Sequence, residues 1–451
     1  MKKPQTLNQS LSTSGTGRQL ATPVFSQPEA TPDPHLFKVK HPSDGPAYKR
    51  IDQLNAEHRI HPLPFPAPRG GIEPTLSFEQ VLGGNKRAIK TIQNNGQIVF
   101  HATGDCGSTT GPRTQCLVTD KMQADFDEMH PAEVPQFALL LGDIVYSFGE
   151  AKYYYDQFYE PYRDYPAPVL AVAGNHDGMI SPLKHEQSLQ AYLRNFCADC
   201  FEVTPEAGGL SRTAQIQPGV FFTFDAPFVR ILVLYSNTLE DPGVIANSTI
   251  GTSQLEFLKA ALTRIKKEAY QGAVLIAHHH PPFTAGSQHG WSTQMQADID
   301  NVCDAVGMWP HAVLCGHVHN YQRFTRTSQD GSQIPYVVCG NGGHNVVPLV
   351  KHGAPPLRVP QVLRSLSANA DQVVLENYDD QNYGYLRLIV TAAQLRIEYH
   401  PASDGPTAKA PDDHVTVDLK SRTLGHYTAN DLGWPQLAAE TRRQRKTSKR
   451  E

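Results

Sequence analysis

The feature that most constrains the fold of this chain is a succession of short apolar runs between about residue 95 and residue 400. Runs such as FALLL, VLAVA and AVLIA follow one another, with helical or loop-like segments between them. Unbroken apolarity over four to seven residues is typical of strands that are buried on both faces of a sheet. The pattern therefore predicts a domain built around buried β-sheet.

Three further segments refine the predicted fold. Residues 253–267 carry Leu and Ile three or four positions apart, which predicts an amphipathic helix leading into a strand at 273–277. Residues 219–234 and 384–401 each resemble two strands joined by a tight turn. This combination favours an α/β (α+β) fold, with two packed mixed β-sheets flanked by helices rather than one doubly wound sheet.

The two ends of the chain differ in composition from the middle. The first residues are rich in Ser, Thr, Gln and Pro, and the last are dominated by Lys and Arg. Such segments cannot bury enough apolar surface to offset the entropy lost on ordering them. The expected division is a disordered segment over 1–35, an irregular Pro-rich extension packing on the core over 36–94, the main domain over 95–400, a C-terminal extension over 401–439 and a basic, disordered tail over 440–451.

Composition also limits the expected partners and compartment. Lys and Arg number 40 against 44 Asp and Glu, so the net charge of -4 gives no general attraction to nucleic acid, and the basic tail is the one hint of such a partner. No run approaches the roughly 18 apolar residues of a membrane span, so no membrane partner is expected. We expect a cytoplasmic protein, because no signal peptide is visible and the 7 cysteines are scattered.

Residues of the kind that bind metals follow five of the predicted strands. Each of these strands stops at Gly or Ala, and Asp, Asn or His comes directly after it. One such ending is ordinary turn chemistry, but five point to a shared site, since α/β folds place their sites at strand ends. Carboxylate, amide and imidazole groups are the donors that first-row metals prefer. The residues are Asp105, Asp143, Asn175 with His176 and Asp177, His279, and His317 with His319.

The number of donors indicates two metal ions. A mononuclear site needs three or four protein ligands, and this set offers at least six. Two cations about 3.5 to 4 Å apart can share a bridging carboxylate, hold a hydroxide and stabilise both oxygens of a displacement at phosphorus. Phosphoester hydrolysis is the chemistry that most needs such a centre, because its uncatalysed rate is extremely low.

In order along the chain, the segments GDCG (104–107), GDIVY (142–146), GNHD (174–177), IAHH (276–279) and GHVH (316–319) resemble the five blocks of calcineurin-like metallophosphoesterases. Two linked differences from the usual motifs of this superfamily make the chain resemble the purple acid phosphatases in particular. The first block has Gly107 where a His is usual, and the second carries Tyr146 three residues after Asp143. A phenolate is a hard anionic donor, so this branch implies Fe(III) beside a divalent metal.

The resemblance also implies a role for each matching residue. The implied ligands are Asp105, Tyr146 and His319 for the iron, Asp143 as the bridge, and Asn175, His279 and His317 for the divalent metal, which would be Fe, Zn or Mn. His278 stays open as the competitor of His279, because only one face of that strand can meet the metals.

Three residues outside the ligand set are the candidate catalytic groups. His176 would contact the phosphate or protonate the leaving group, and Asp177 would hold the tautomer of His176. His289 lies ten residues beyond His279 in a Gly- and Ser-rich loop. It is either a phosphate contact or an ordinary loop residue.

The implied activity is that of a metal-dependent acid phosphatase, in which a metal-bound hydroxide attacks a phosphomonoester of a small molecule. Two alternatives stay open: a phosphodiesterase of the same superfamily that uses two divalent metals, and an inactive scaffold that retains the fold. The choice between monoester and diester depends on loops at the rim of the site, whose shape the sequence does not give.

Overall fold

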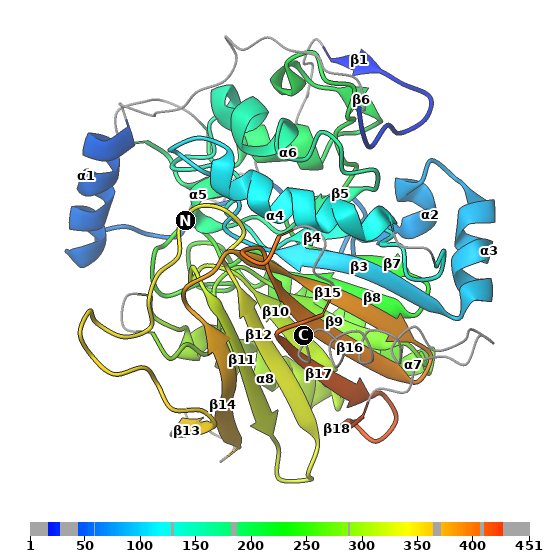
Figure 1. Cartoon of the computed structure of the whole chain (residues 1–451), viewed down its shortest axis with the longest axis vertical. Coiled ribbons are helices and arrows are strands. Elements are labelled where there is room, and N and C mark those ends of the chain that lie inside the picture. Colours follow the sequence, from blue (N-terminus) through cyan, green and yellow to red (C-terminus); the bar gives the residue numbers. More distant parts are fainter. Residues whose placement is uncertain are drawn as a thin grey trace, which may run out of the picture.

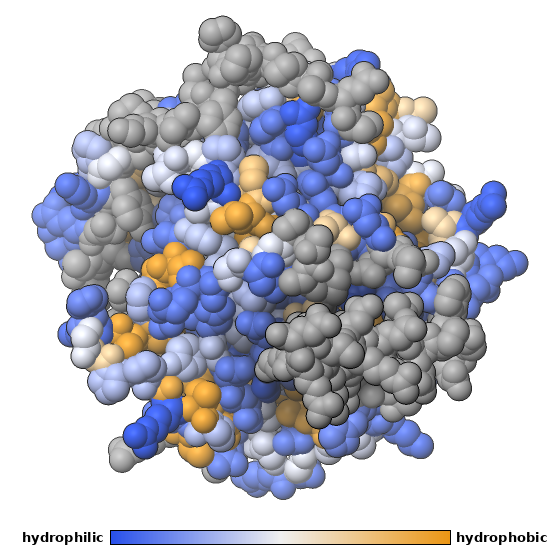
Figure 2. All heavy atoms as spheres, viewed as in Figure 1, coloured by the Kyte–Doolittle hydropathy of each residue, from blue (hydrophilic) through white to orange (hydrophobic). Residues whose placement is uncertain are grey.

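The structure is a computed structural model that describes residues 17–27, 44–57, 59–127, 130–181, 187–286, 289–363, 371–405 and 410–426. The predicted basic tail at 440–451 and, except for 17–27, the predicted disordered segment lie outside these residues. Within them, no helix has the length and apolarity needed to cross a membrane. The face seen in Figure 2 is mostly hydrophilic, and its apolar side chains form small separate groups.

Two large mixed sheets form the centre of the molecule (Figure 1), which confirms the predicted fold class. In spatial order, the nine-stranded sheet contains β13 (Gln361–Leu363), β14 (Gln372–Asp379), β11 (Tyr321–Thr327), β12 (Gln333–Cys339), β10 (Ala312–Cys315), β9 (Ala273–Ala277), β8 (Val229–Val233), β7 (Phe222–Ala226) and β2 (Thr75–Ser77). The seven-stranded sheet contains β18 (Thr423–Leu424), β17 (Asp413–Asp418), β16 (Gln394–Pro401), β15 (Gly384–Thr391), β3 (Gln97–Thr103), β4 (Ala138–Leu140) and β5 (Val169–Ala171).

The strands that carry the predicted ligands run parallel within each sheet. β3, β4 and β5 are parallel neighbours, with Thr103 paired to Leu140 and Leu140 paired to Ala171. In the other sheet β9 lies parallel to β10. Parallel neighbours end at the same edge, so the polar residues that follow them are brought together.

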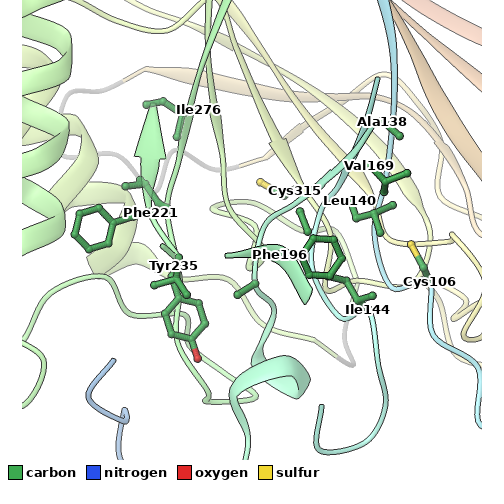
Figure 3. Close-up of a cluster of buried hydrophobic side chains, with 14 of the residues drawn as sticks. Cys106, Ala138, Leu140, Ile144, Val169, Phe196, Phe221, Tyr235, Ile276 and Cys315 are labelled. Carbon is green, nitrogen blue, oxygen red and sulfur yellow. The ribbon is translucent and has the colours of Figure 1, made fainter. Parts of the chain in front are cut away.

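The apolar runs are buried on both faces, as predicted, because alternate side chains enter two different cores. One core lies between the sheets and takes Phe100, Leu139 and Leu275. The other lies on the outer faces, where Leu140 and Val169 pack beside Phe196 (Figure 3).

Helices cover the outer faces of the sheets (Figure 1). The helix predicted over 253–267 is confirmed as α7 (Ser253–Lys267), which buries Leu258, Leu262 and Ile265. The other helices are α1 (Asp44–Ala56), α2 (Phe78–Val81), α3 (Lys86–Asn95), α4 (Arg113–Ala124), α5 (Asn175–Gly178), α6 (Gln190–Phe196) and α8 (Thr293–Val306). Shorter turns of 3₁₀ or π helix occupy Asp125–Asp127, Ala151–Tyr153, Tyr155–Tyr159 and Pro205–Ala207.

Both predicted hairpins are confirmed. β7 pairs antiparallel with β8, so that Phe222 lies opposite Val233. β15 pairs antiparallel with β16 over almost their full length, from Gly384 opposite Pro401 to Val390 opposite Leu395.

The terminal regions contain more structure than we expected from the sequence. β1 (Arg18–Gln19), inside the segment predicted to be disordered, pairs with β6 (Glu202–Val203). The Pro-rich extension supplies β2, which joins the nine-stranded sheet beside β7. Beyond residue 400, β17 and β18 extend the seven-stranded sheet. These elements have two to six residues, so their apolar runs are too short to be distinguished from loops by periodicity.

Candidate metal centre

Polar residues from both sheets meet at one place. Asp105 and Asp143 follow β3 and β4, and Asn175 begins α5 after β5. His279 and His317 follow β9 and β10 of the other sheet, and all five side chains are buried. The backbone N–H of His317 donates to Oδ2 of Asp105 over 2.8 Å. This bond joins the strand ends of the two sheets directly.

The glycines that precede Asp143 and Asn175 allow the strand ends to approach one another closely. Gly142 has a φ of +99°, and a Cβ at this position would strike the ring of His279. A Cβ on Gly174 would overlap the carboxylate of Asp143. The Gly-Asp and Gly-Asn pairs therefore reflect a packing requirement, since a larger residue would push the two sheets apart.

Three of the predicted ligands have left-handed backbone. The φ angles are 56° at Asp105, 54° at Asp143 and 68° at His317. A residue with a Cβ pays about 1 to 3 kcal/mol for such a conformation, and it persists where the surrounding structure enforces it. At these three positions the strained backbone presents a predicted ligand to the shared site.

One cluster of donors is formed by Asp105, Tyr146 and His319. The hydroxyl of Tyr146 lies 3.0 Å from Oδ1 of Asp105 and 3.3 Å from Nε2 of His319. Nε2 of His319 lies 3.3 Å from the same oxygen of Asp105. Burial and the neighbouring carboxylate of Asp105 raise the pKa of the Tyr146 phenol well above its ordinary value, so a cation is needed to favour the phenolate.

Gly107 leaves room for this tyrosine. A Cβ at residue 107 would lie 3.0 Å from the Tyr146 ring and closer still to the carbonyl oxygen of Ile144. The first motif therefore cannot carry an imidazole at this position while Tyr146 keeps its place. On its other face, the Tyr146 ring stacks on His344 with ring centroids 3.6 Å apart.

A second cluster is formed by Asp105, Asp143 and His279, whose donor atoms all lie within 4.8 Å of one another. Nε2 of His279 is 3.2 Å from Oδ2 of Asp143 and 3.9 Å from Oδ1 of Asp105. Burial alone would raise the pKa of Asp143, but the charges of His279 and His176 hold that pKa well below its usual range. The bridging candidate is therefore an ionised carboxylate.

Hydrogen bonds on the far side of two rings fix their tautomers. Nδ1 of His279 donates to the carbonyl oxygen of Leu141 over 2.7 Å. Nδ1 of His319 pairs with Oδ1 of Asn345. Each ring therefore turns Nε2 toward the centre, which is the arrangement that metal-binding histidines use.

Several buried donor atoms of the site have no hydrogen bond among the residues that the structure describes. They are Oδ1 of Asn175 and Nε2 of His317, whereas Nε2 of His279 lacks hydrogen-bond geometry but lies against Oδ2 of Asp143. Buried polar atoms are almost always satisfied, so an unpartnered set in one place calls for a bound group. The shorter donor separations, of 3.0 to 3.3 Å, fit two ligands of one cation, because donors about 2.1 Å from a tetrahedral ion lie about 3.4 Å apart. The residues present therefore fit bound metal ions.

His176 lies beside the clusters and is held through its backbone N–H and its ring. Its backbone N–H donates to Oδ1 of Asp143 over 2.9 Å, and its Nδ1 donates to the carbonyl oxygen of Ser147 over 2.8 Å. Its Nε2 is 3.8 Å from both Oδ2 of Asp143 and Oε1 of Glu240. The carbonyl of Ser147 thus fixes the tautomer of His176 and leaves Nε2 facing the site.

The expected role of Asp177 is corrected by this arrangement. Its carboxylate accepts the backbone N–H groups of Asp143, Ile144, Val145 and Gly174 over 2.8 to 3.3 Å. Asp177 therefore ties the loop after β4 to the loop after β5, and the tautomer of His176 depends on Ser147 instead. A carboxylate beside a histidine in sequence does not reveal which of several amides it will meet.

The structure also shows where the histidines lie whose roles the sequence did not decide. His279, rather than His278, reaches Asp105 and Asp143. Nδ1 of His278 donates to the carbonyl oxygen of His280 and lies 3.7 Å from Sγ of Cys315. The His289 ring lies 4.9 Å from the His317 ring between centroids, so this loop residue belongs to the site.

Two acidic residues near the centre were missed by sequence reasoning. Glu240 lies near His176, and Oδ1 of Asp241 lies 3.5 Å from Nε2 of His317. Both follow β8 by several residues, within the segment SNTLEDPG. No acidic residue directly follows the apolar run there, so the signal that revealed the other ligands is absent.

Comparisons with known proteins agree with the motifs. Residues 99–321 match the family model of the calcineurin-like phosphoesterases. Probable purple acid phosphatase 20 of Arabidopsis thaliana is 23% identical over 328 residues, which cover 68% of this chain and 67% of the relative. Probable inactive purple acid phosphatase 9 of the same plant is 22% identical over 416 residues, which cover 82% of this chain and 61% of the relative. These matches confirm the predicted resemblance.

Among solved structures, purple acid phosphatase PPD1 from seeds of yellow lupin (Lupinus luteus) aligns with a TM-score of 0.47 and 16% identity. The alignment covers 74% of this chain and 57% of the lupin chain. The chain thus spans between 57% and 67% of the length of the three proteins that it matches here.

Proposed function

Residues 99–321 of this chain match the calcineurin-like phosphoesterase family and the chain has purple acid phosphatase relatives, and on that premise we propose that the protein hydrolyses phosphomonoesters of small molecules with the help of two metal ions. The observation that carries the proposal is the unpartnered set of buried donors. Asn175, at the start of α5, and His317, after β10, each have such an atom, and the Asp105–Tyr146 pair lies at the same strand ends.

We assign the donors to two positions. Asp105, Tyr146 and His319 would hold Fe(III), because their donor atoms form one cluster that includes a phenol oxygen. Asp143 would bridge the two positions. Asn175, His279 and His317 would hold the divalent ion, and the separation of 3.2 Å between His279 and Asp143 supports a shared ion.

Bound cations would lower the pKa of a water molecule and neutralise charge on the phosphate. The chain supplies the remaining groups. His176 keeps a proton on Nδ1 through the carbonyl of Ser147, so its Nε2 can accept a proton from solvent and donate it toward a phosphate oxygen or a leaving group. Asp177 holds the loops of Asp143 and His176 in register through its bonds to backbone amides.

The test is hydrolysis of para-nitrophenyl phosphate by the purified protein, before and after treatment with a chelator. Activity that is lost on chelation and returns on adding Fe and Zn is expected. A matched pair of variants separates the site from the rest of the chain: Asp143→Asn should be inactive, and Asp298→Asn, at a half-buried position of α8 outside the site, should behave like wild type. Absence of turnover in the metal-loaded wild type, with intact folding, would favour an inactive scaffold.

The same protein can be tested on bis(para-nitrophenyl) phosphate. A monoesterase should prefer the singly substituted substrate, whose dianionic phosphate binds two cations more strongly than a monoanionic diester does. A clear preference for the diester would replace the proposed substrate class with the phosphodiesters.

A further inference from the structure

A second group of possible metal donors lies at the edge of the centre, and only one of its three residues belongs to the five motifs. Asp241, His289 and His317 each place a donor atom within 4.8 Å of the others. His317 is 2% exposed, and its Nε2 has no hydrogen bond among the described residues. This unpartnered nitrogen faces Oδ1 of Asp241 at 3.5 Å.

The loop that carries Asp241 is held in place from two sides. The backbone N–H of Gly290 donates to Oδ1 of Asp241 over 2.8 Å, which connects the loop to the neighbour of His289. Asn237 accepts the N–H of Leu63 and donates to its carbonyl oxygen, so the N-terminal extension holds the start of the loop. Asp241 is therefore positioned before any ion binds, which lowers the ordering cost of using it as a ligand.

Distance and burial indicate a cation between these residues. A separation of 3.5 Å without hydrogen-bond geometry is longer than a good N–H···O bond, yet it is close to the roughly 3.4 Å that can separate two ligands of one metal ion. A carboxylate beside a buried imidazole also adds a negative charge that a divalent ion would neutralise.

We propose that Asp241 is an additional carboxylate ligand of the divalent ion bound at His317, with His289 as the neighbouring donor. This inference rests on the proposed function, because it assumes that His317 binds a metal. It extends the centre to a loop outside the strand ends and gives the divalent position a hard oxygen donor of the kind that Mn²⁺ accepts.

The test uses the full-length protein after a chelator has removed the divalent ion, with Mn²⁺ alone as the probe and free Mn²⁺ counted by electron paramagnetic resonance. Asp241→Asn should weaken Mn²⁺ binding at least roughly tenfold. The Asn side chain retains an oxygen that can accept the Gly290 amide, so the loop should keep its shape, and circular dichroism checks the fold. His289→Gln tests the same group from its other side and should also weaken binding.

Glu240→Gln is the matched control. It removes the same charge from the adjacent residue, which is outside the donor group, and should leave Mn²⁺ binding near the wild-type value. Wild-type affinity in both Asp241→Asn and His289→Gln would overturn the proposal. An equal loss in Glu240→Gln and Asp241→Asn would also overturn it, because attraction by charge alone would then explain the effect. A wild-type protein that binds no divalent ion would overturn the proposed function as well, whereas an active enzyme whose Mn²⁺ affinity is unchanged in both Asp241→Asn and His289→Gln would overturn this inference alone.

Discussion

The phenol oxygen of Tyr146 lies 3.0 Å from Oδ1 of Asp105, which joins a side chain from the loop after β4 to one from the loop after β3. The space for this contact exists because residue 107 is Gly. The absence of an imidazole at residue 107 and the presence of a phenol at residue 146 are therefore structurally coupled. The assignment of iron to this position rests on this pair.

The colour of the protein should depend on Tyr146. A phenolate bound to Fe(III) transfers electron density to the metal under visible light, so we expect the oxidised wild type to be purple to pink. Tyr146→Phe should lose the visible band and keep the divalent ion, as measured by absorption spectroscopy with elemental analysis. A colourless wild type that is fully active with divalent metals alone would contradict the iron assignment.

Asp143→Asn should be the most damaging single change among the ligands. An amide has one good acceptor oxygen and no charge, whereas a bridging carboxylate offers two anionic oxygens to two ions. Elemental analysis should show both metals reduced, together with the loss of turnover. Metal content and rate near wild type would show that Asp143 does not bridge.

His176→Ala should separate chemistry from metal binding. Because the ring is proposed to act on the substrate rather than as a ligand, metal content should stay at the wild-type level while kcat falls roughly 10²- to 10⁴-fold. Loss of a metal ion from this variant would instead make His176 a ligand.

Cation binding should release a proton from His279. Although burial opposes it, the carboxylates of Asp143 and Asp105 raise the pKa of His279 to about 10 in the absence of metal. The ring is therefore protonated below that pH, and a cation must displace the proton from Nε2. The apparent affinity for the ion should rise about tenfold per pH unit on the acidic side of this pKa. Calorimetry in two buffers of different ionisation enthalpy measures the proton count, and an affinity independent of pH would contradict the prediction.

Much of the centre could be predicted because strand-end residues leave a local signal. The apolar runs that precede Asp105, Asp143 and His279 give both the buried strands and the points at which they end. Two hairpins, such as that of β7 and β8, could be predicted because each pair of strand-like segments is joined by a short turn.

The rest depends on contacts between segments distant in sequence. Asp241 and His317 are 76 positions apart in the sequence, and His176 is 29 positions from Ser147, whose carbonyl oxygen accepts its hydrogen bond. No local sequence pattern predicts either contact. The short strands β1, β2 and β18 also gain their stability from the partner to which they pair, rather than from their own two or three residues.

The central claim is that these buried donors hold two metal ions, and the metal content of the purified protein tests it most directly. Elemental analysis per folded chain should give about two metal ions, one of them iron, in the wild type, and about none after chelation. A folded wild-type protein that contains no stoichiometric metal, and takes up none when Fe and Zn are supplied, would contradict the account.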